Sequence, residues 1–265
     1  MRIIPVIVGP TGSGKTGVGI EVAKAIEQKF GKRAEIISAD SRTIYRGFDV
    51  GTAKPTIAER EGVTHFGFDL VEADERFTVS DWKKYAEEKI LEIEERGNIP
   101  IVVGGTGLYV DALIFDYKFN SSTNKLNKEG NKIVHGDSTE YPDREKMCSK
   151  YKVFGIFWER DELRERLRKR ADKMFNQELY DETERLVRKY GWENQAMKSD
   201  VYQFAWEYMQ GRKSREESVE LAAIDDWHLA RRQLTWFKRN EKILWLPLEK
   251  IKPAVIKCIQ DEQGK

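Results

Sequence analysis

Residues 9–16 of the chain are Gly9-Pro10-Thr11-Gly12-Ser13-Gly14-Lys15-Thr16. This is the Gly-x-x-x-x-Gly-Lys-[Ser/Thr] spacing of a phosphate-binding loop. An apolar run at 3–8 precedes the loop, and a helix-like stretch follows it at 18–30. Because strand, glycine-rich turn and helix are the context that the motif needs, we predict a unit that holds a di- or triphosphate.

Each part of this loop suits a phosphate. Glycines let backbone N–H groups converge on phosphate oxygens, and the N-terminus of the following helix adds partial positive charge. Lys15 supplies a full charge, and the Thr16 hydroxyl is suited to a magnesium ion. The predicted diphosphate-binding residues of the loop are Thr11, Gly12, Ser13, Gly14, Lys15 and Thr16. The loop alone leaves open whether the phosphate is transferred, hydrolysed or expelled.

Apolar strand-like runs alternate with helical segments along the first half of the chain. The patterns predict strands at 34–38, 99–103, 152–158 and 243–246, and helices at 15–30, 80–95 and 108–113. Ser80 is the expected N-cap of the second helix and Gly97 its stop. Residues 161–240 read as mainly helical, and Pro253 is expected to begin a last short helix. This alternation predicts an α/β fold, a P-loop NTPase-like parallel sheet flanked by helices, with a helical C-terminal half.

Residues 118–150 differ from the rest of the chain. They are rich in Asn, Ser, Lys, Asp and Glu and show no clear period. We predict a short polar, flexible insertion inside a single domain that spans 1–265.

Composition narrows the function classes. The chain has 46 basic and 45 acidic residues, so any nucleic-acid surface has to be a local patch. No apolar run approaches the roughly 20 residues of a membrane span, and no signal peptide is recognisable, so a cytoplasmic location is expected. The two cysteines and three histidines have no metal-ligand spacing: Cys148, Cys258, His65, His135 and His228.

Polar and glycine-rich segments follow the predicted strands. Besides the loop at 9–16, Asp40-Ser41 follows the second strand and Gly104-Gly105-Thr106-Gly107 follows the third. Ligands of parallel sheets bind at these carboxyl ends. Asp40 could act there as a general base or bind magnesium through water, although a lone Asp more often forms an Asx turn or caps a helix. The adjacent phosphate loop favours the functional interpretation.

A predicted helix after Asp161 carries arginines beside an apolar stripe of Leu163, Leu167 and Met174. Arg170 falls within the stripe and Arg166 lies one turn earlier. A guanidinium that faces the core needs an anion partner, so either could bind the diphosphate, with Arg170 favoured. A solvated basic helix face is the alternative.

The long C-terminal helix has an apolar stripe that includes Asp226 and Gln233. Basic and aromatic residues surround the stripe: Arg231, Arg232, Lys238, Arg239, Trp227 and Trp236. Such interleaving suits an RNA backbone and stacked bases. The alternative is a packed helix with a charged outer face, and core packing is favoured for Trp236 and Phe237.

Several ordered blocks belong together. After the loop come 38–42 (Ser-Ala-Asp-Ser-Arg), 45–47 (Tyr-Arg-Gly), 49–55 (Asp-Val-Gly-Thr-Ala-Lys-Pro), 102–109 (Val-Val-Gly-Gly-Thr-Gly-Leu-Tyr) and 230–239 (Ala-Arg-Arg-Gln-Leu-Thr-Trp-Phe-Lys-Arg). This set resembles the tRNA dimethylallyltransferase family. Many NTPases share the glycine loop, whereas the stretch from Asp-Ser-Arg to Gly-Thr-Ala-Lys-Pro is far more specific.

The resemblance implies transfer of a dimethylallyl group from its diphosphate to the exocyclic amine of the adenosine just 3′ of the tRNA anticodon. Pyrophosphate leaves, and the loop, Lys15 and Mg²⁺ on Thr16 suit the neutralisation of its charge. The amine must lose a proton, for which Asp40 is the candidate base. Thr106 could position the amine or a phosphate oxygen, and the target base has to be flipped out of its stack.

The implied partners are dimethylallyl diphosphate and the tRNA anticodon stem-loop, with Mg²⁺ as cofactor and a monomer as the expected state. Asp40, Thr106 and Arg170 are the expected catalytic residues, and Arg166 joins the loop in binding diphosphate. The expected tRNA contacts are Asp40, Ser41, Arg42, Thr43, Lys54, Arg231, Arg232 and Gln233.

The chain departs from the family pattern in three places. Family members usually carry a longer helical insertion after the Gly-Gly-Thr block, with a Pro-Asn-Asp motif that is absent here. Val201-Tyr202-Gln203-Phe204 stands where Gly-Tyr-Lys-Glu is expected, and Thr43 replaces the usual glutamine. Transfer to a free adenine nucleotide (AMP, ADP or ATP), a P-loop small-molecule kinase or NTPase, and RNA binding without catalysis therefore remain alternatives.

Overall fold

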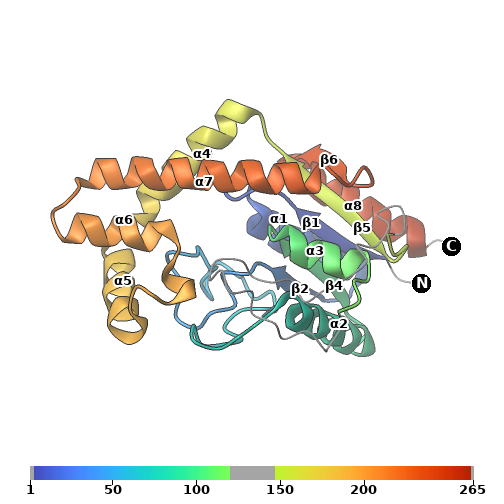
Figure 1. Ribbon diagram of the computed structural model, residues 1–265. Helices are drawn as coiled ribbons and strands as arrows, with labels where there is room; N and C mark the ends of the chain where they lie inside the picture. Colours follow the sequence, from blue (N-terminus) through green and yellow to red (C-terminus); the bar gives the residue numbers. More distant parts are fainter. Residues whose placement is uncertain (1–2, 120–146, 264–265) are drawn as a thin grey trace.

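A computed structural model describes residues 3–119 and 147–263, and its centre is one parallel sheet (Figure 1). The strand order is β3-β2-β4-β1-β5-β6, and all paired neighbours run parallel. The strands are β1 (Ile4–Val8), β2 (Ala34–Ala39), β3 (His65–Phe66), β4 (Ile99–Gly104), β5 (Tyr151–Phe157) and β6 (Leu244–Pro247). The predicted α/β fold with a parallel sheet is confirmed.

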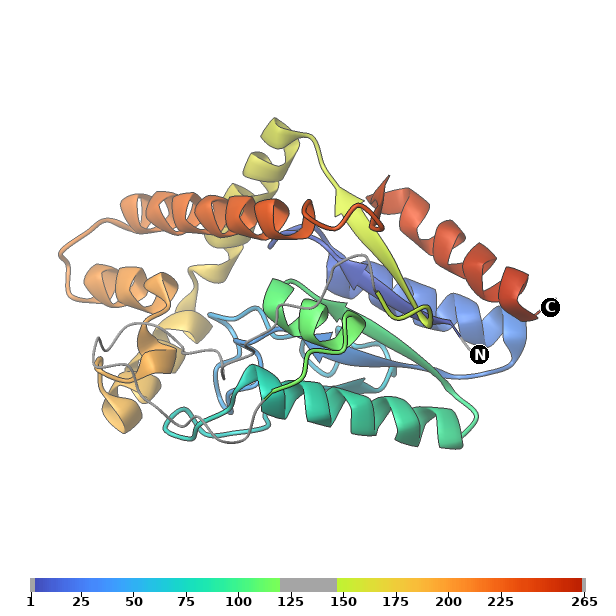
Figure 2. The same cartoon turned by 45° about the vertical axis from the view of Figure 1, so that its right-hand side comes forward.

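Helices cover both faces of the sheet (Figure 2). One face packs against α1 (Lys15–Phe30) and α8 (Leu248–Gln263), and the other against α2 (Val79–Glu95) and α3 (Gly107–Ile114). All residues of β1, β2 and β4 are buried. Strands covered on both faces read as continuous apolar runs, which explains why these strands could be predicted.

The C-terminal half adds a group of helices beside the sheet. These are α4 (Arg160–Met174), α5 (Gln177–Tyr190), α6 (Asp200–Met209), α7 (Arg215–Phe237) and a short 3₁₀ helix, η2 (Gln195–Met197). In Figure 1, α7 runs from this helical group back to the sheet. Leu163 and Leu167 of α4 pack against Ala230 of α7, so the two helices act as one unit behind the phosphate loop.

A separate apolar cluster joins the segment after β2 to the helical group. Phe48 and Ala73 pack there with Phe175, Leu179 and Tyr202, and the Phe48 and Tyr202 rings meet edge to face at 5.7 Å. The polar segment that follows Asp40 therefore has a core of its own, built by residues more than a hundred positions further along the chain.

The structure corrects the sequence reading of three elements. The N-cap of α2 is Thr78 rather than Ser80, because Thr78 and Asp81 form a reciprocal capping box. Strand β3 was not predicted, since its two residues are too few to show a period. Helix α8 begins at Leu248 and contains Pro253; the fully buried Ile251 and Val255 outweigh the hydrogen bond that proline cannot donate.

The predicted polar insertion at 118–150 lies mainly outside the described residues, and only its flanks are placed. The Phe119 ring lies 6.4 Å from that of Tyr117, and the Cys148 N–H donates to the Ile114 carbonyl at 2.8 Å. No helix within 3–119 or 147–263 is long and apolar enough to cross a membrane.

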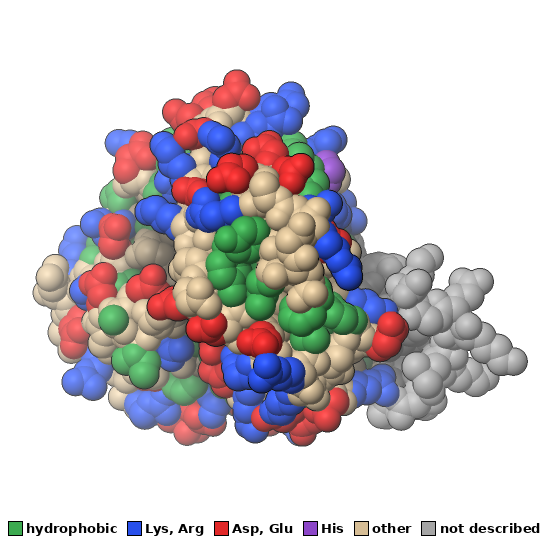
Figure 3. Space-filling model, turned by 90° about the vertical axis from the view of Figure 1, so that its left-hand side faces the viewer, with side chains coloured by type: hydrophobic (Ala, Val, Ile, Leu, Met, Phe, Trp, Pro, Cys, Tyr) green, Lys and Arg blue, Asp and Glu red, His purple; other side chains and the backbone are tan. Residues whose placement is uncertain are grey.

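The surface carries both signs of charge. On the face shown in Figure 3, Lys and Arg side chains are mixed with Asp and Glu side chains around small apolar areas. This agrees with the formal net charge of +1, so any surface that binds nucleic acid has to be a local group of basic residues.

Candidate active site

The carboxyl ends of β1, β2 and β4 bring three loops together, because these strands are neighbours in the sheet. The phosphate loop follows β1, Asp40 follows β2, and Gly105-Thr106 follows β4. The contact between the last two is tight: a Cβ on Gly104 would lie 2.1 Å from the Ala39 carbonyl oxygen. The Thr106 N–H donates to that same carbonyl at 3.0 Å.

The phosphate loop has the backbone that its glycines allow. Gly12 and Gly14 have φ values of 70° and 87°, in the left-handed region that favours glycine. A Cβ on Gly12 would also meet the Leu167 side chain at 2.5 Å, so α4 seals the outside of the loop. Trp158 braces its far end, with the indole Nε1 donating to the Ser13 carbonyl at 3.0 Å.

Lys15 folds back over this loop. Its Nζ donates to the Pro10 carbonyl at 2.6 Å. Burial lowers the pKa of the Lys15 ammonium to about 8; Asp40 and Asp226 raise it and Arg170 lowers it in smaller measure. Those three charged groups are therefore close enough to Lys15 to act on a ligand bound beside it.

Both arginines predicted on α4 contact the loop. Arg166 donates from Nε to the Gly12 carbonyl at 3.1 Å and stacks 4.2 Å over the Trp158 ring. Arg170 donates from Nη1 to Thr11 Oγ1 at 3.1 Å and to Asp226 Oδ2. Arg170 is largely buried and needs an anion partner, and this partner is the Asp226 carboxylate of α7.

Gln233 of α7 ties two of the loops together. Its Oε1 accepts the Thr11 N–H at 2.7 Å, and its Nε2 donates to the Gly105 carbonyl at 3.0 Å. Both ends of the amide are engaged, so the predicted RNA contact of Gln233 does not fit its inward position. Gln233 instead sets the spacing between the phosphate loop and the turn that carries Thr106.

Thr106 is hydrogen-bonded to Ser41, the residue that follows Asp40. Asp40 Oδ1 accepts the Arg42 N–H at 2.8 Å, as expected for an Asx turn. Thr106 Oγ1 accepts the Ser41 N–H at 2.9 Å and lies 3.2 Å from Ser41 Oγ. Among the described residues, Asp40 Oδ2 accepts no hydrogen bond, so the turn leaves one carboxylate oxygen available to a substrate.

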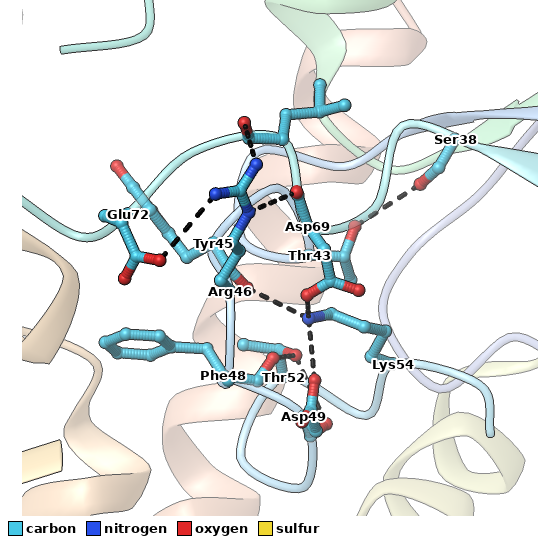
Figure 4. Close-up of polar contacts among 12 residues, drawn as sticks. Ser38, Thr43, Tyr45, Arg46, Phe48, Asp49, Thr52, Lys54, Asp69 and Glu72 are labelled. Carbon is cyan, nitrogen blue, oxygen red and sulfur yellow. Dashed lines mark hydrogen bonds and ion pairs between the residues drawn. The ribbon is translucent and has the colours of Figure 1, made fainter. Parts of the chain in front are cut away.

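Two predicted tRNA contacts, Thr43 and Lys54, are buried instead. Thr43 is 4% exposed and lies 3.4 Å from both Ser38 Oγ and the Asp40 carbonyl. The Lys54 side chain is 3% exposed, with its Nζ 2.7 Å from Asp49 and 2.7 Å from Asp69 (Figure 4). Neither side chain faces solvent, so both stabilise the loop from within.

Glu182 is a residue that sequence reasoning missed. This carboxylate, 5% exposed, accepts N–H groups from Asp49, Val50 and Gly51 at 2.9–3.0 Å. It also accepts the Tyr202 hydroxyl at 2.8 Å. A Cβ on Gly51 would lie 2.4 Å from the Tyr202 ring, which requires glycine there. Glu182 thus holds the segment after Asp40 against α5 and α6.

The outer surface of α7 carries the basic residues predicted to meet RNA. Arg231 and Arg232 are exposed, and they line an open groove of about 500 Å³ with His228, Thr235, Trp236 and Arg239. Trp236 donates from Nε1 to Asp111 at 2.9 Å, and Arg239 stacks 4.0 Å over its ring. Phe237 is 1% exposed, in agreement with the predicted core packing.

A parallel sheet whose first strand leads into a loop of phosphate-binding spacing, with Asp40 at the end of β2 and two arginines of α4 against the loop, is typical of P-loop enzymes, whose substrates are phosphorylated. The comparison with known sequences narrows this class. The chain matches the profile of the family described as "IPP transferase" over residues 43–145 and 132–240. It belongs to the IPP transferase family.

Curated relatives share most of their length with this chain. A tRNA dimethylallyltransferase of Pelotomaculum thermopropionicum is 36% identical over 92% of this chain and 90% of the relative. A tRNA dimethylallyltransferase of Acetivibrio thermocellus is 34% identical over 93% of this chain and 92% of the relative. The first of these alignments spans 289 positions, more than the 265 residues of this chain, so the relative has segments that this chain lacks.

A solved structure has the same fold. It is the tRNA delta(2)-isopentenylpyrophosphate transferase of Staphylococcus epidermidis, with a TM-score of 0.78 and 31% sequence identity. The similarity covers 100% of this chain and 99% of that one. The correspondence extends over the helical half as well as the sheet.

Proposed function

We propose that the chain transfers a dimethylallyl group from dimethylallyl diphosphate to the exocyclic amine of the adenosine 3′ of a tRNA anticodon. The observation that carries the proposal is the meeting of the phosphate loop, Asp40 and Thr106 at one edge of the sheet. The names of the relatives agree with this activity.

The donor diphosphate binds on the glycine loop. Backbone N–H groups of 14–16 and the N-terminus of α1 face its oxygens, with Lys15 beside them. Arg166 and Arg170 already contact this loop from the side of α4. These positive groups stabilise the charge that develops on the diphosphate as the carbon–oxygen bond breaks.

The reaction exchanges one bond for another. The amine nitrogen forms a bond to the allylic carbon, the bond from that carbon to the diphosphate oxygen breaks, and pyrophosphate leaves with the electron pair. The amine proton passes to Asp40, whose Oδ2 accepts no hydrogen bond from the described residues. Thr106 acts by holding Ser41, and through it the turn that positions Asp40.

The oxygen atoms at this site also suit Mg²⁺ as ligands. The described residues contain no group of three or more His, Cys, Asp or Glu that could hold a metal. Magnesium, however, typically uses one or two protein oxygens together with substrate phosphates and water. The Thr16 hydroxyl is such an oxygen, the Asp40 carboxylate would bind the ion through a water molecule, and the ion would supply further charge neutralisation for the diphosphate.

The acceptor side is RNA rather than a small molecule. Arg42, Arg231 and Arg232 are exposed around the site, where phosphates of an anticodon stem-loop can reach them. A free adenine nucleotide would need no such surface. The missing segments of this chain nevertheless make nucleotide transfer the alternative to test. A monomer in the cytoplasm is part of the proposal.

The test is mass analysis of nucleosides from tRNA incubated with the protein, dimethylallyl diphosphate and Mg²⁺. Prenylated adenosine is expected, without any need for ATP. Absence of product with every adenosine-containing anticodon loop would rule the proposal out. Faster turnover of AMP than of tRNA in a competition assay would favour the nucleotide as acceptor.

A further inference from the structure

Asp226 is a carboxylate placed in a site built for anions. Its Oδ2 accepts a hydrogen bond from Arg170 Nη1, which also donates to Thr11 Oγ1 at 3.1 Å. The Asp226 and Arg170 side chains are only 20% and 25% exposed. A carboxylate disfavours an anionic ligand nearby, and the proposed transfer gives Asp226 no step.

The position of Asp226 is fixed by its own helix. Ala230, one turn further along α7, is fully buried against Leu163 and Leu167 of α4. Gln233, two turns along, is bonded to Thr11 at 2.7 Å. This face of α7 is therefore anchored both to α4 and to the phosphate loop, and Asp226 is held beside Arg170.

The hydrogen bond to Asp226 orients the Arg170 guanidinium but occupies only one of its three nitrogens. Among the described residues, only Nη1 of Arg170 has hydrogen-bond partners. The edge formed by Nε and Nη2 is left for a ligand, and this planar edge matches two phosphate oxygens. Asp226 thus holds the guanidinium at Nη1, beside Thr11 of the phosphate loop, and leaves the N–H groups of Nε and Nη2 without a partner in the described part of the chain.

The charge of Asp226 also reaches the rest of the site. Burial is the main cause of the lowered pKa of Lys15; among the neighbouring charges, Asp40 and Asp226 raise that pKa and Arg170 lowers it. Pyrophosphate, free of its ester, carries more negative charge than the donor. A fixed negative charge therefore destabilises bound product more than bound donor.

We propose that Asp226 is a positioning residue that holds Arg170 toward the diphosphate, and that its charge limits how tightly the pyrophosphate product is retained. The inference rests on the proposed function, since it requires pyrophosphate to be the product. It assigns to α7 a part in product release in addition to its proposed contact with RNA.

Asp226→Asn separates these effects, because the amide keeps an acceptor for Arg170 and removes the charge. Calorimetric titration with inorganic pyrophosphate and Mg²⁺ should show binding about threefold to tenfold tighter than in the wild type. In steady state, kcat and the donor KM should fall by similar factors, so that kcat/KM changes little. Glu220→Gln is the matched control. It makes the same charge change at an exposed position of α7, where Glu220 pairs with Arg168, and should leave pyrophosphate binding unchanged.

Unchanged or weaker pyrophosphate binding by a folded Asp226→Asn protein would overturn the inference. Asp226→Ser, a smaller uncharged acceptor, provides the same measurement if the Asn variant does not fold. Wild-type protein that binds pyrophosphate but prenylates no acceptor would overturn the proposed function and the role in product release, whereas tighter pyrophosphate binding by Asp226→Asn would still show that the charge of Asp226 acts on the anion site. Wild-type protein that binds no pyrophosphate would overturn both.

Discussion

The Tyr202 hydroxyl donates to Glu182 at 2.8 Å, and through this carboxylate α6 and α5 hold the backbone at 49–51. Tyr202 is the residue retained in the segment where the family pattern is otherwise eroded. The ring packs on Gly51, and the hydroxyl supplies a fourth hydrogen bond to the buried Glu182 carboxylate.

This relationship predicts a graded loss of stability. Tyr202→Phe should cost about 1 kcal/mol of unfolding free energy, because one hydrogen bond is removed while the packing remains. Glu182→Ala should cost roughly 3 kcal/mol, since three backbone N–H groups and the buried Tyr202 hydroxyl lose their acceptor. Urea unfolding measures both. Glu184→Gln, an exposed change on the same helix, is the control; equal losses from all three variants would contradict the ranking.

Diphosphate binding should depend on pH through Lys15. Its pKa, lowered by burial to about 8, leaves the ammonium charged below that pH and neutral above it. Bound diphosphate favours the charged form, so affinity should be steady below about pH 7.5 and weaken up to about tenfold per pH unit above pH 8.

Pyrophosphate titrations from about pH 6.5 to about pH 9.5 measure this effect. Pyrophosphate itself also titrates in this range, and Lys15→Arg, which stays charged, isolates the contribution of the lysine. Identical pH profiles for the two proteins would argue against it. Lys15→Ala should weaken pyrophosphate binding and turnover together at every pH.

Asp40→Asn should lower turnover by about a hundredfold while pyrophosphate affinity is retained. The amide oxygen can still accept the Arg42 N–H, so the turn survives and only the basic oxygen is removed. Single-turnover prenylation and calorimetry give the two quantities. Near-normal turnover would remove Asp40 from the role of base. Asp40→Ala, which also breaks the turn, should be at least as slow.

Arg231→Gln with Arg232→Gln should weaken tRNA binding and make it less dependent on salt. Each arginine–phosphate ion pair that is removed should reduce the slope of log affinity against log salt by about 0.7–0.9. Pyrophosphate binding should not change. Arg168→Gln, whose cation lies 3.6 Å from Glu220, should have the smaller effect. A salt slope equal to that of the wild type would show that Arg231 and Arg232 do not contact RNA phosphates.

Most of the sheet and the phosphate loop could be predicted from the sequence because their signals are local. Buried parallel strands are continuous apolar runs, and the loop spacing specifies its own backbone. Lys54 is a residue whose environment the local sequence does not predict. A lysine in a turn is expected to be solvated, yet its Nζ donates to two carboxylates and a backbone carbonyl in the folded chain. No spacing in the sequence indicates that Asp69 will be one of them.

The sequence by itself determined the α/β class, the phosphate loop, Asp40 at the next strand end and two arginines one turn apart on a helix. All of these depend on neighbours within a few turns of chain. Only the tertiary structure decided that Gln233, 222 positions from Thr11, would bind it, and that Asp226 would pair with Arg170. The physical reason is that the path of α7 across the site follows from its packing on α4, which involves residues far apart in the chain.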